Sequence, residues 1–280
     1  ILRHTCVRDS EIFAPVVEDM VILKSMTLVY WPGYSNQIVH WNSYEGYKIK
    51  MELPGEVTFT GTDTDKTLAL GEGWSLLPVL TDQNVEAVGF FAPVFDDLII
   101  AKSIDGQGVY WPSVGVQTLQ QLNPGESYMV KLDAPGSLTF PALSAKSAIA
   151  EKGYPDPIKS DVWVTPSNTG NTHTIAFNPD AVSMFGEGDY IGVFDMNDRC
   201  VGLTQVAKDS DLVISVYCDD KTTNEKDGMY PGERFIFRLY SSAEEDISEF
   251  VAEFDNQYHQ DYVDNGLSLI TKITSAPNGI

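Results

Sequence analysis

The sequence is poor in cysteine, which limits what can hold the chain together covalently. Its three cysteines, Cys6, Cys200 and Cys218, are too few for a disulfide scaffold but leave room for one bridge. No Cys-x-x-Cys pair or Cys/His cluster indicates zinc, because the four histidines are scattered along the chain. No apolar run reaches the roughly 18 residues of a membrane-spanning helix, so no membrane insertion is predicted.

Basic residues are also scarce. The chain has 18 Lys and Arg against 40 Asp and Glu, which gives a net charge of -22 at pH 7. Such a surface repels nucleic acid and anionic lipid and attracts divalent cations. The acidity is typical either of a protein soluble in a crowded or salty exterior or of one with a specific cation site. Nucleic acid is therefore not an expected partner.

Catalytic signatures are missing as well. The sequence has no Gly-x-Ser-x-Gly elbow, no phosphate-binding glycine-rich loop and no local motif at any histidine. A glycosidase needs two carboxylates flanking a cleft, but 40 acidic residues single out no pair. The sequence therefore predicts that this chain is not an enzyme.

What the sequence does contain is an internal repeat in its first half. Phe13–Ser25 returns as Phe91–Ser103, with eight of the 13 positions identical. Two further blocks recur in the same order, Tyr30–Pro32 as Tyr110–Pro112 and Asn42–Phe59 as Asn123–Phe140. In this alignment Ile1 matches Val79, so the strand that begins at Gly73 has no counterpart in the first copy. We expect that strand to lie upstream or to come from another segment, leaving an unpaired sheet edge near Ile1.

Short β-branched runs and alternating segments predict that both halves are built from strands. In the repeat the predicted strands are 20–23, 47–51 and 57–59 with their equivalents 98–101, 128–132 and 138–140. One short helix is expected at 84–91, ended by Pro93. In the second half the predicted strands are 162–164, 173–177, 190–194, 200–203, 212–217, 234–240 and 267–270.

Together these patterns predict an all-β chain, with two repeated small modules followed by an antiparallel, jelly-roll-like β-sandwich. The expected domains are 1–71, 72–146 and 161–275, with a linker at 147–160 that contains a Gly-Tyr-Pro-Asp-Pro run.

The second half resembles a known kind of module. The matching blocks are Gly188–Asp195, Cys200–Gly202, Tyr217–Thr223, Asp227–Met229, Gly232–Glu233 and Asn265–Ser268. They are similar to a β-sandwich module of secreted Bacteroidota proteins, and the first-half repeat resembles modules found beside it. Cys218 departs from the pattern, which has glycine there. The resemblance implies a secreted, extracellular or cell-surface protein exported through type IX secretion, and the family has no defined activity.

Acidic and amide side chains gather at the predicted strand ends of the second half. The candidate ligands are Asp195, Asn197, Asp219, Asp220 and Asp227. Calcium binds six to eight hard oxygens, often from loops of this composition. No EF-hand loop is present, and Asp and Asn also cap turns through their own backbone. The sequence therefore leaves two interpretations of these residues, turn capping and a calcium site, and the calcium site is the one that a chelator can test.

Two aromatic residues stand out from those that recur in both copies. Trp41 and Tyr44 are replaced by Leu122 and Gly125 in the second copy, whereas the recurring aromatics are predicted to pack in cores and turns. Trp41 and Tyr44 are therefore the candidate ligand-binding residues, with glycan as the candidate ligand.

The spacing of two cysteines predicts a disulfide. A hairpin turning near Asp209 places Cys200 and Cys218 nine residues from the turn on opposite strands. Opposed positions of this kind bring the Cα atoms within reach of a bridge. We predict a Cys200–Cys218 disulfide and an unpaired Cys6.

The sequence thus predicts a non-catalytic adhesive or structural segment of an extracellular surface protein. Its expected partners are other extracellular proteins or further copies of the same protein. The alternative is a carbohydrate-binding accessory module of a larger secreted enzyme.

Overall fold

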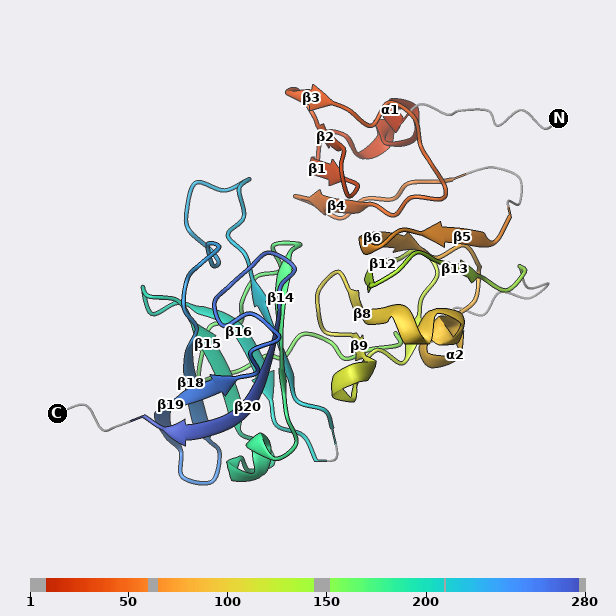
Figure 1. Cartoon of the computed structure of the whole chain (residues 1–280). Helices are drawn as coiled ribbons and strands as arrows, with labels where there is room; N and C mark the ends of the chain where they lie inside the picture. The colour runs from red at the N-terminus through yellow and green to blue at the C-terminus, as the bar shows by residue number, and fades with distance from the viewer. Residues whose placement is uncertain (1–8, 60–64, 144–151, 209, 277–280) are drawn as a thin grey trace. The chain divides into compact units, whose positions relative to one another are not determined.

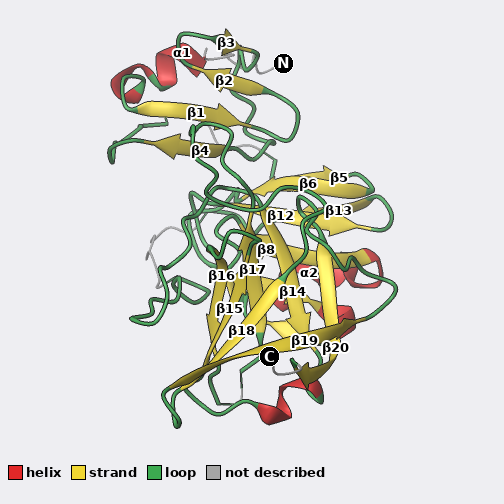
Figure 2. Ribbon diagram, turned by 90° about the vertical axis from the view of Figure 1, so that its left-hand side faces the viewer, coloured by secondary structure: helices red, strands yellow, loops and turns green. Residues whose placement is uncertain are grey.

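The computed structural model describes residues 9–59, 65–143, 152–208 and 210–276 (Figure 1). Strands account for most of its regular structure, and Figure 2 shows short helices between them. The predicted all-β class is therefore confirmed. In the described part of the chain no helix is long and apolar enough to cross a membrane.

The chain divides into two compact units that do not follow the predicted domain boundaries. One unit contains residues 1–101 and 121–153, and the other contains residues 102–120 and 154–280. The division therefore falls inside the second module, because its central segment, 102–120, belongs with the last domain rather than with its own repeat.

The first module forms a four-stranded antiparallel sheet with the order β3-β2-β1-β4. Its elements are α1 (Asp9–Ile12), η1 (Ala14–Val16), β1 (Met20–Lys24), β2 (Val29–Trp31), β3 (Ser35–Asn36) and β4 (Lys48–Met51). A small core lies against the sheet, where Phe13, Leu23 and Ile38 are buried. The apolar positions of the repeat motif thus form the core of the module.

The second module repeats this strand order and adds one strand, giving β10-β9-β8-β12-β6. Its elements are β5 (Thr67–Leu70), β6 (Gly73–Pro78), β7 (Val85–Glu86), α2 (Ala87–Phe91), η2 (Ala92–Asp97), β8 (Leu98–Ser103), β9 (Val109–Trp111), η3 (Pro112–Val114), β10 (Val116–Gln117), β11 (Gln121–Leu122), β12 (Ser127–Leu132) and β13 (Gly136–Thr139). The predicted helix is present, capped by the Glu86 carboxylate, and Pro93 lies at the start of the 3-10 helix that follows it.

The repeat is visible in equivalent hydrogen bonds as well as in strand order. In the first copy the Tyr47 hydroxyl accepts a hydrogen bond from the Asn42 amide at 3.2 Å. In the second copy the Tyr128 hydroxyl accepts from the Asn123 amide at 2.9 Å. Each tyrosine also donates to the glutamate of its own Asn-x-x-Glu-x-Tyr motif. The motif is therefore a structural one, in which tyrosine satisfies backbone and carboxylate groups at the start of β4 or β12.

The strand without a sequence counterpart is β6, which pairs with β12 from Gly73 to Pro78. Among the described residues, the sheet of the first module has no strand in the equivalent place beside β4. Ile1, near which we predicted an unpaired edge, lies outside the described residues.

The last domain is a closed barrel with the order β14-β17-β16-β15-β18-β19-β20, where we predicted a sandwich. Its elements are β14 (Thr172–Phe177), η4 (Ala181–Met184), β15 (Tyr190–Phe194), β16 (Cys200–Gln205), β17 (Val213–Tyr217), β18 (Ile236–Ser241), β19 (Asp246–Phe254) and β20 (Leu267–Ser275). The parallel pairing of β14 with β20 closes the barrel, and the other pairs are antiparallel. Ile175, Val193, Ile214 and Phe237 lie in its core.

Candidate functional site

The predicted calcium ligands lie in two loops at the ends of barrel strands. Asp195 follows β15, and one of its carboxylate oxygens, Oδ1, accepts hydrogen bonds from the Asn197 and Arg199 amides at 2.9 and 3.0 Å. Asp198, in the same turn, has a φ of 65°. Asp195 therefore caps a tight turn through its own side chain, and the Asn197 residue contributes its backbone amide to that turn.

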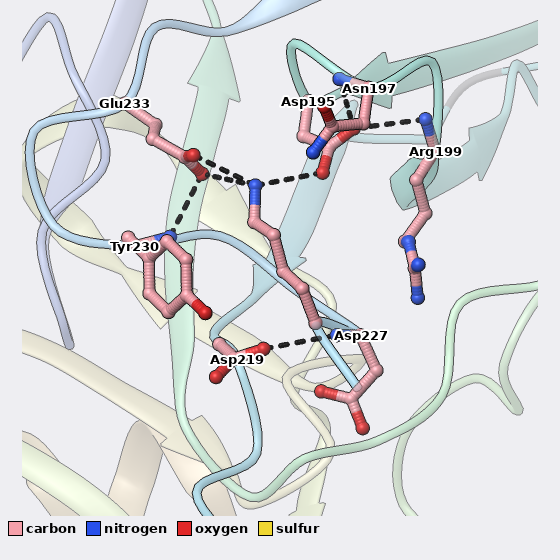
Figure 3. Close-up of polar contacts among 8 residues, drawn as sticks. Asp195, Asn197, Arg199, Asp219, Asp227, Tyr230 and Glu233 are labelled. Carbon is pink, nitrogen blue, oxygen red and sulfur yellow. Dashed lines mark hydrogen bonds and ion pairs between the residues drawn. The ribbon is translucent and has the colours of Figure 1, made fainter. Parts of the chain in front are cut away.

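The second Asp195 oxygen, Oδ2, accepts a hydrogen bond from the ammonium group of Lys226. Lys226 Nζ lies 2.9 Å from Asp195 Oδ2 and 2.8 and 3.0 Å from the two Glu233 oxygens (Figure 3). The ammonium also lies 5.1 Å from the centre of the Tyr230 ring. The Asp195 side chain has no exposed surface, whereas Lys226 and Glu233 are partly exposed. Lys226 is thus the cation that neutralises a buried carboxylate.

The ion pair shifts both pKa values in the direction that favours charge. Burial alone raises the pKa of Asp195, but the Lys226 ammonium and the two backbone amides outweigh it, so the net pKa is lowered. Burial alone lowers the pKa of Lys226, but Glu233 and Asp195 outweigh it, so the net pKa is raised. Both groups are therefore charged at neutral pH.

The other predicted ligands belong to one loop between β17 and β18. Asp219 Oδ1 accepts from the Asp227 amide at 3.0 Å, and Asp227 Oδ1 accepts from the Asp220 amide at 2.8 Å. Asp220 Oδ1 accepts from both the amide and the hydroxyl of Thr222. The loop requires glycine at position 228, since a Cβ there would overlap the Cys218 carbonyl oxygen. These carboxylates stabilise the fold of the loop.

The arrangement supports turn capping, which was the alternative to calcium. The described residues include no group of three or more His, Cys, Asp and Glu side chains that could hold a metal ion. Calcium stays a prediction, which chelation tests. EDTA lowers the melting temperature of the full chain if calcium stabilises the loop, and leaves it unchanged if the hydrogen bonds alone do.

Replacing Lys226 should show how much an unpaired, buried Asp195 carboxylate destabilises the folded chain. We expect Lys226→Met to lower the free energy of unfolding by about 1–3 kcal/mol, because Asp195 loses a charged hydrogen-bond partner. Lys221→Met is the matched control, since Lys221 is an exposed lysine of the same loop and should cost less than about 0.5 kcal/mol. Urea denaturation measures both, and equal costs for the two variants would contradict this assignment.

The two cysteines of the barrel are free thiols, so the predicted disulfide is absent. The predicted register is present, because Gly202 pairs with Val216 across β16 and β17. However, the register between β15 and β16 shifts at Val201, and Cys200 pairs with Phe194 of β15. Cys218 lies beyond β17 and makes an isolated β-bridge, through its backbone, with Met229. Each cysteine is thus turned to a different neighbour. Cys6 lies outside the described residues.

Burial should make both thiols slow to react. It raises the pKa of Cys200 to about 12 and also raises the pKa of Cys218. The thiolate is the reactive form, and with so high a pKa the Cys200 thiol stays almost entirely protonated at pH 8. In a Cys6→Ser background we expect little labelling by a thiol reagent in the native state and two labelled thiols after unfolding without reductant. No labelling after unfolding would show that the bridge forms.

The two candidate ligand-binding aromatics differ in their surroundings. Trp41 is partly buried against the core of the first module, with its ring stacked on Tyr47 at 4.2 Å and 4.8 Å from the Phe59 ring. Tyr44 is exposed, and its amide bonds to the Asn42 side chain. The structure therefore does not bring the two rings together as a platform, and Trp41 packs as a core residue does.

A surface that the sequence did not single out lies on the sheet of the second module. Lys102, Val109 and Trp111 face one side of β8 and β9, and we call this set the Lys102 face. All three are buried, and Lys102 is 1% exposed. Its ammonium donates to the Thr172 carbonyl at 2.8 Å and to the hydroxyls of Thr172 and Thr174 on β14. The Trp111 ring meets Tyr258 edge-on at 5.1 Å. The barrel thus covers this face.

The equivalent surface of the first module, the Lys24 face, consists of Lys24, Val29 and Trp31 with the neighbouring Tyr34. Lys24 pairs with Val29 across β1 and β2, and Trp31 lies two residues further on, so the three share one side of the sheet. Here Lys24 is exposed, Trp31 is 38% exposed and Tyr34 is 81% exposed. The Trp31 and Tyr34 rings lie 4.9 Å apart. The repeat therefore presents one face twice, covered in the second copy and open in the first.

A buried histidine, His173, lies on β14, the strand that contacts Lys102. His173 Nδ1 accepts from the Val263 amide at 3.1 Å, and Nε2 lies 2.8 Å from the Ser268 hydroxyl, which itself donates to the His259 carbonyl. Burial, reinforced by the nearby charge of Lys102, lowers the pKa of His173 to about 3. The network therefore holds a neutral imidazole.

No protein-family model matches this chain, and comparisons with curated proteins and with solved structures found no match either.

Proposed function

We propose that this chain is a non-catalytic segment of an extracellular surface protein that binds other proteins and spaces domains. The observation that carries the proposal is the difference between Trp111 and Trp31. The first is fully buried under the barrel, and the second occupies the same repeat position on an open surface. Exposed tryptophan and tyrosine beside a charge are typical of the residues that dominate protein interfaces.

The composition and the resemblance to modules of secreted Bacteroidota proteins support an extracellular location reached through type IX secretion. A net charge of -22 favours a soluble protein and disfavours nucleic acid as a partner. The thiols are compatible with an oxidising exterior, because burial keeps Cys200 and Cys218 protonated and slow to oxidise. Tandem modules add reach and allow several weak contacts to act together.

The alternative is a carbohydrate-binding accessory module, for which Trp41 was the first candidate residue. The Trp41 ring contacts Tyr47 and Phe59 on the core side of the module, so it is not free to stack on a sugar. Protein binding is the better-supported proposal, because the Lys102 face already binds a folded domain within this chain.

A hydrolysis screen of the purified full chain tests the non-catalytic part of the proposal. We expect no turnover of a broad panel of glycan and ester substrates. Turnover that is lost when a single residue such as Asp195 is changed to asparagine, in a variant that still folds, would show that the chain is an enzyme.

A further inference from the structure

A second unexplained surface lies on the barrel, on the outer side of β19. Ile247, Glu249 and Val251 alternate along this strand, so their side chains lie on one face. Ile247 is 47% exposed and Val251 is 48% exposed. The Glu249 carboxylate between them accepts a hydrogen bond from Arg238 Nε at 3.1 Å and is half exposed. We call these three residues the β19 face.

The β19 face and the Lys24 face are complementary in chemistry. One places an exposed carboxylate between two aliphatic side chains, and the other places an exposed ammonium beside two aromatic rings. Two copies with a net charge of -22 repel each other at long range, so the pairing depends on the local contact between the Lys24 ammonium and the Glu249 carboxylate and on the apolar side chains around them.

We propose that the Lys24 face of one copy of this chain binds the β19 face of a second copy. The inference rests on the proposed function and names the partner. The partner surface cannot be the one that the Lys102 face uses, because Thr172, Thr174 and Tyr258 of the second copy already contact that copy's own second module. The outer side of β19 stays exposed on that barrel.

The β1–β2 loop next to the Lys24 face differs from the equivalent β8–β9 loop of the second module, and the difference favours a partner surface other than the one around β14. In the second module the β8–β9 loop makes polar contacts with the barrel, since the Asp105 and Gly106 carbonyls accept hydrogen bonds from Tyr217 and Ser215. The shorter β1–β2 loop of the first module carries Met26 and Leu28, both exposed. These apolar side chains suit the aliphatic β19 face better than the hydroxyl-rich surface around β14.

The contact is heterologous, because the two faces are different surfaces. Each copy that joins leaves one Lys24 face and one β19 face unoccupied, so association continues head to tail into a ring or a filament. Linked copies would give a surface protein many weak contact points along one assembly.

Sedimentation velocity of the full chain at increasing protein concentration tests the proposal. We expect association that increases with protein concentration, and we expect Trp31→Ala to raise the concentration needed for half-association by about tenfold or more. Val164→Ala, at a valine that is 85% exposed and lies outside both faces, should leave that concentration unchanged. Circular dichroism confirms that each variant is folded. A wild-type chain that stays monomeric at every concentration would overturn the proposal.

A charge exchange identifies the two faces. Lys24→Glu and Glu249→Lys chains should each associate more weakly alone, and an equimolar mixture should recover association, because reversed faces meet. Arg238 keeps its ion pair with Asp198 in the second variant.

Association insensitive to Glu249→Lys would overturn the proposal and indicate that two Lys24 faces pair. A chain that stays monomeric, but whose migration in a gel is slowed by an included glycan and restored by Trp31→Ala, would overturn the proposal and show that the Lys24 face binds a glycan. Substrate turnover in the hydrolysis screen would instead contradict the proposed function, whatever the sedimentation result.

Discussion

Replacing Trp111 with alanine is expected to lower the free energy of unfolding by about 3–5 kcal/mol, which is the usual cost of deleting a fully buried tryptophan. The indole has no exposed surface and contacts Tyr258 of the barrel, so its removal leaves a cavity that rigid strands cannot fill. The same change at Trp31 should cost less than about 1 kcal/mol, because that ring is 38% exposed and loses mainly its contact with Tyr34.

The pair is a matched test, since both tryptophans occupy the same position of the repeat. Urea denaturation followed by both fluorescence and far-ultraviolet circular dichroism measures the two costs and shows whether the two units unfold together. Similar costs for the two variants would mean that the Lys24 face is covered as well. A Trp31→Ala variant that associates less but folds as stably as the wild type would support the docking role of that residue.

Acidification from pH 7 to pH 4 should remove about 3 kcal/mol of stability through His173 alone. The unfolded chain takes up a proton at this histidine below about pH 6.5. The folded chain does not, because burial lowers the pKa of His173 to about 3. Between those two pH values the unfolded state binds more protons, so stability falls as the pH falls.

The His173→Asn variant isolates this contribution. Asparagine keeps an acceptor for the Val263 amide but cannot titrate, so the variant should be less stable than wild type at pH 7 and should lose less stability on acidification. The matched control is His40→Asn, at an exposed histidine, which should follow the wild-type profile. Denaturant midpoints across the pH range measure the difference. A His173→Asn variant with the full wild-type acid sensitivity would rule out the histidine as its source.

The sequence was most informative where the structure depends on neighbouring residues. The repeat, the short helix before Pro93 and the strands around Tyr47 and Tyr128 all follow local patterns, and the structure contains them. The predicted strand at 162–164 does not form, and β19 was missed because Asp246, Ser248, Glu249 and Glu253 hide the alternation of its apolar residues.

Contacts between distant residues were not predictable from one sequence. The cation beside Asp195 is Lys226, 31 residues away, and no local spacing links the two. Lys102 is buried by Thr172, 70 residues further along the chain. The cysteine register was right, but the irregularity beside Val201 cannot be recognised from residue types, and it decides which neighbour Cys200 meets.

The division of the chain inside the second module has a mechanical consequence. The polypeptide passes from one compact unit to the other after residue 101, returns after residue 120 and passes over again after residue 153. A pulling force on the two ends therefore acts on several connections in parallel, one of which is strand β8 itself. A single cut between 147 and 160 would leave the first and second passages intact, so the two halves should stay joined after proteolysis there. This interlaced path therefore resists separation of the two halves without a disulfide among the described residues.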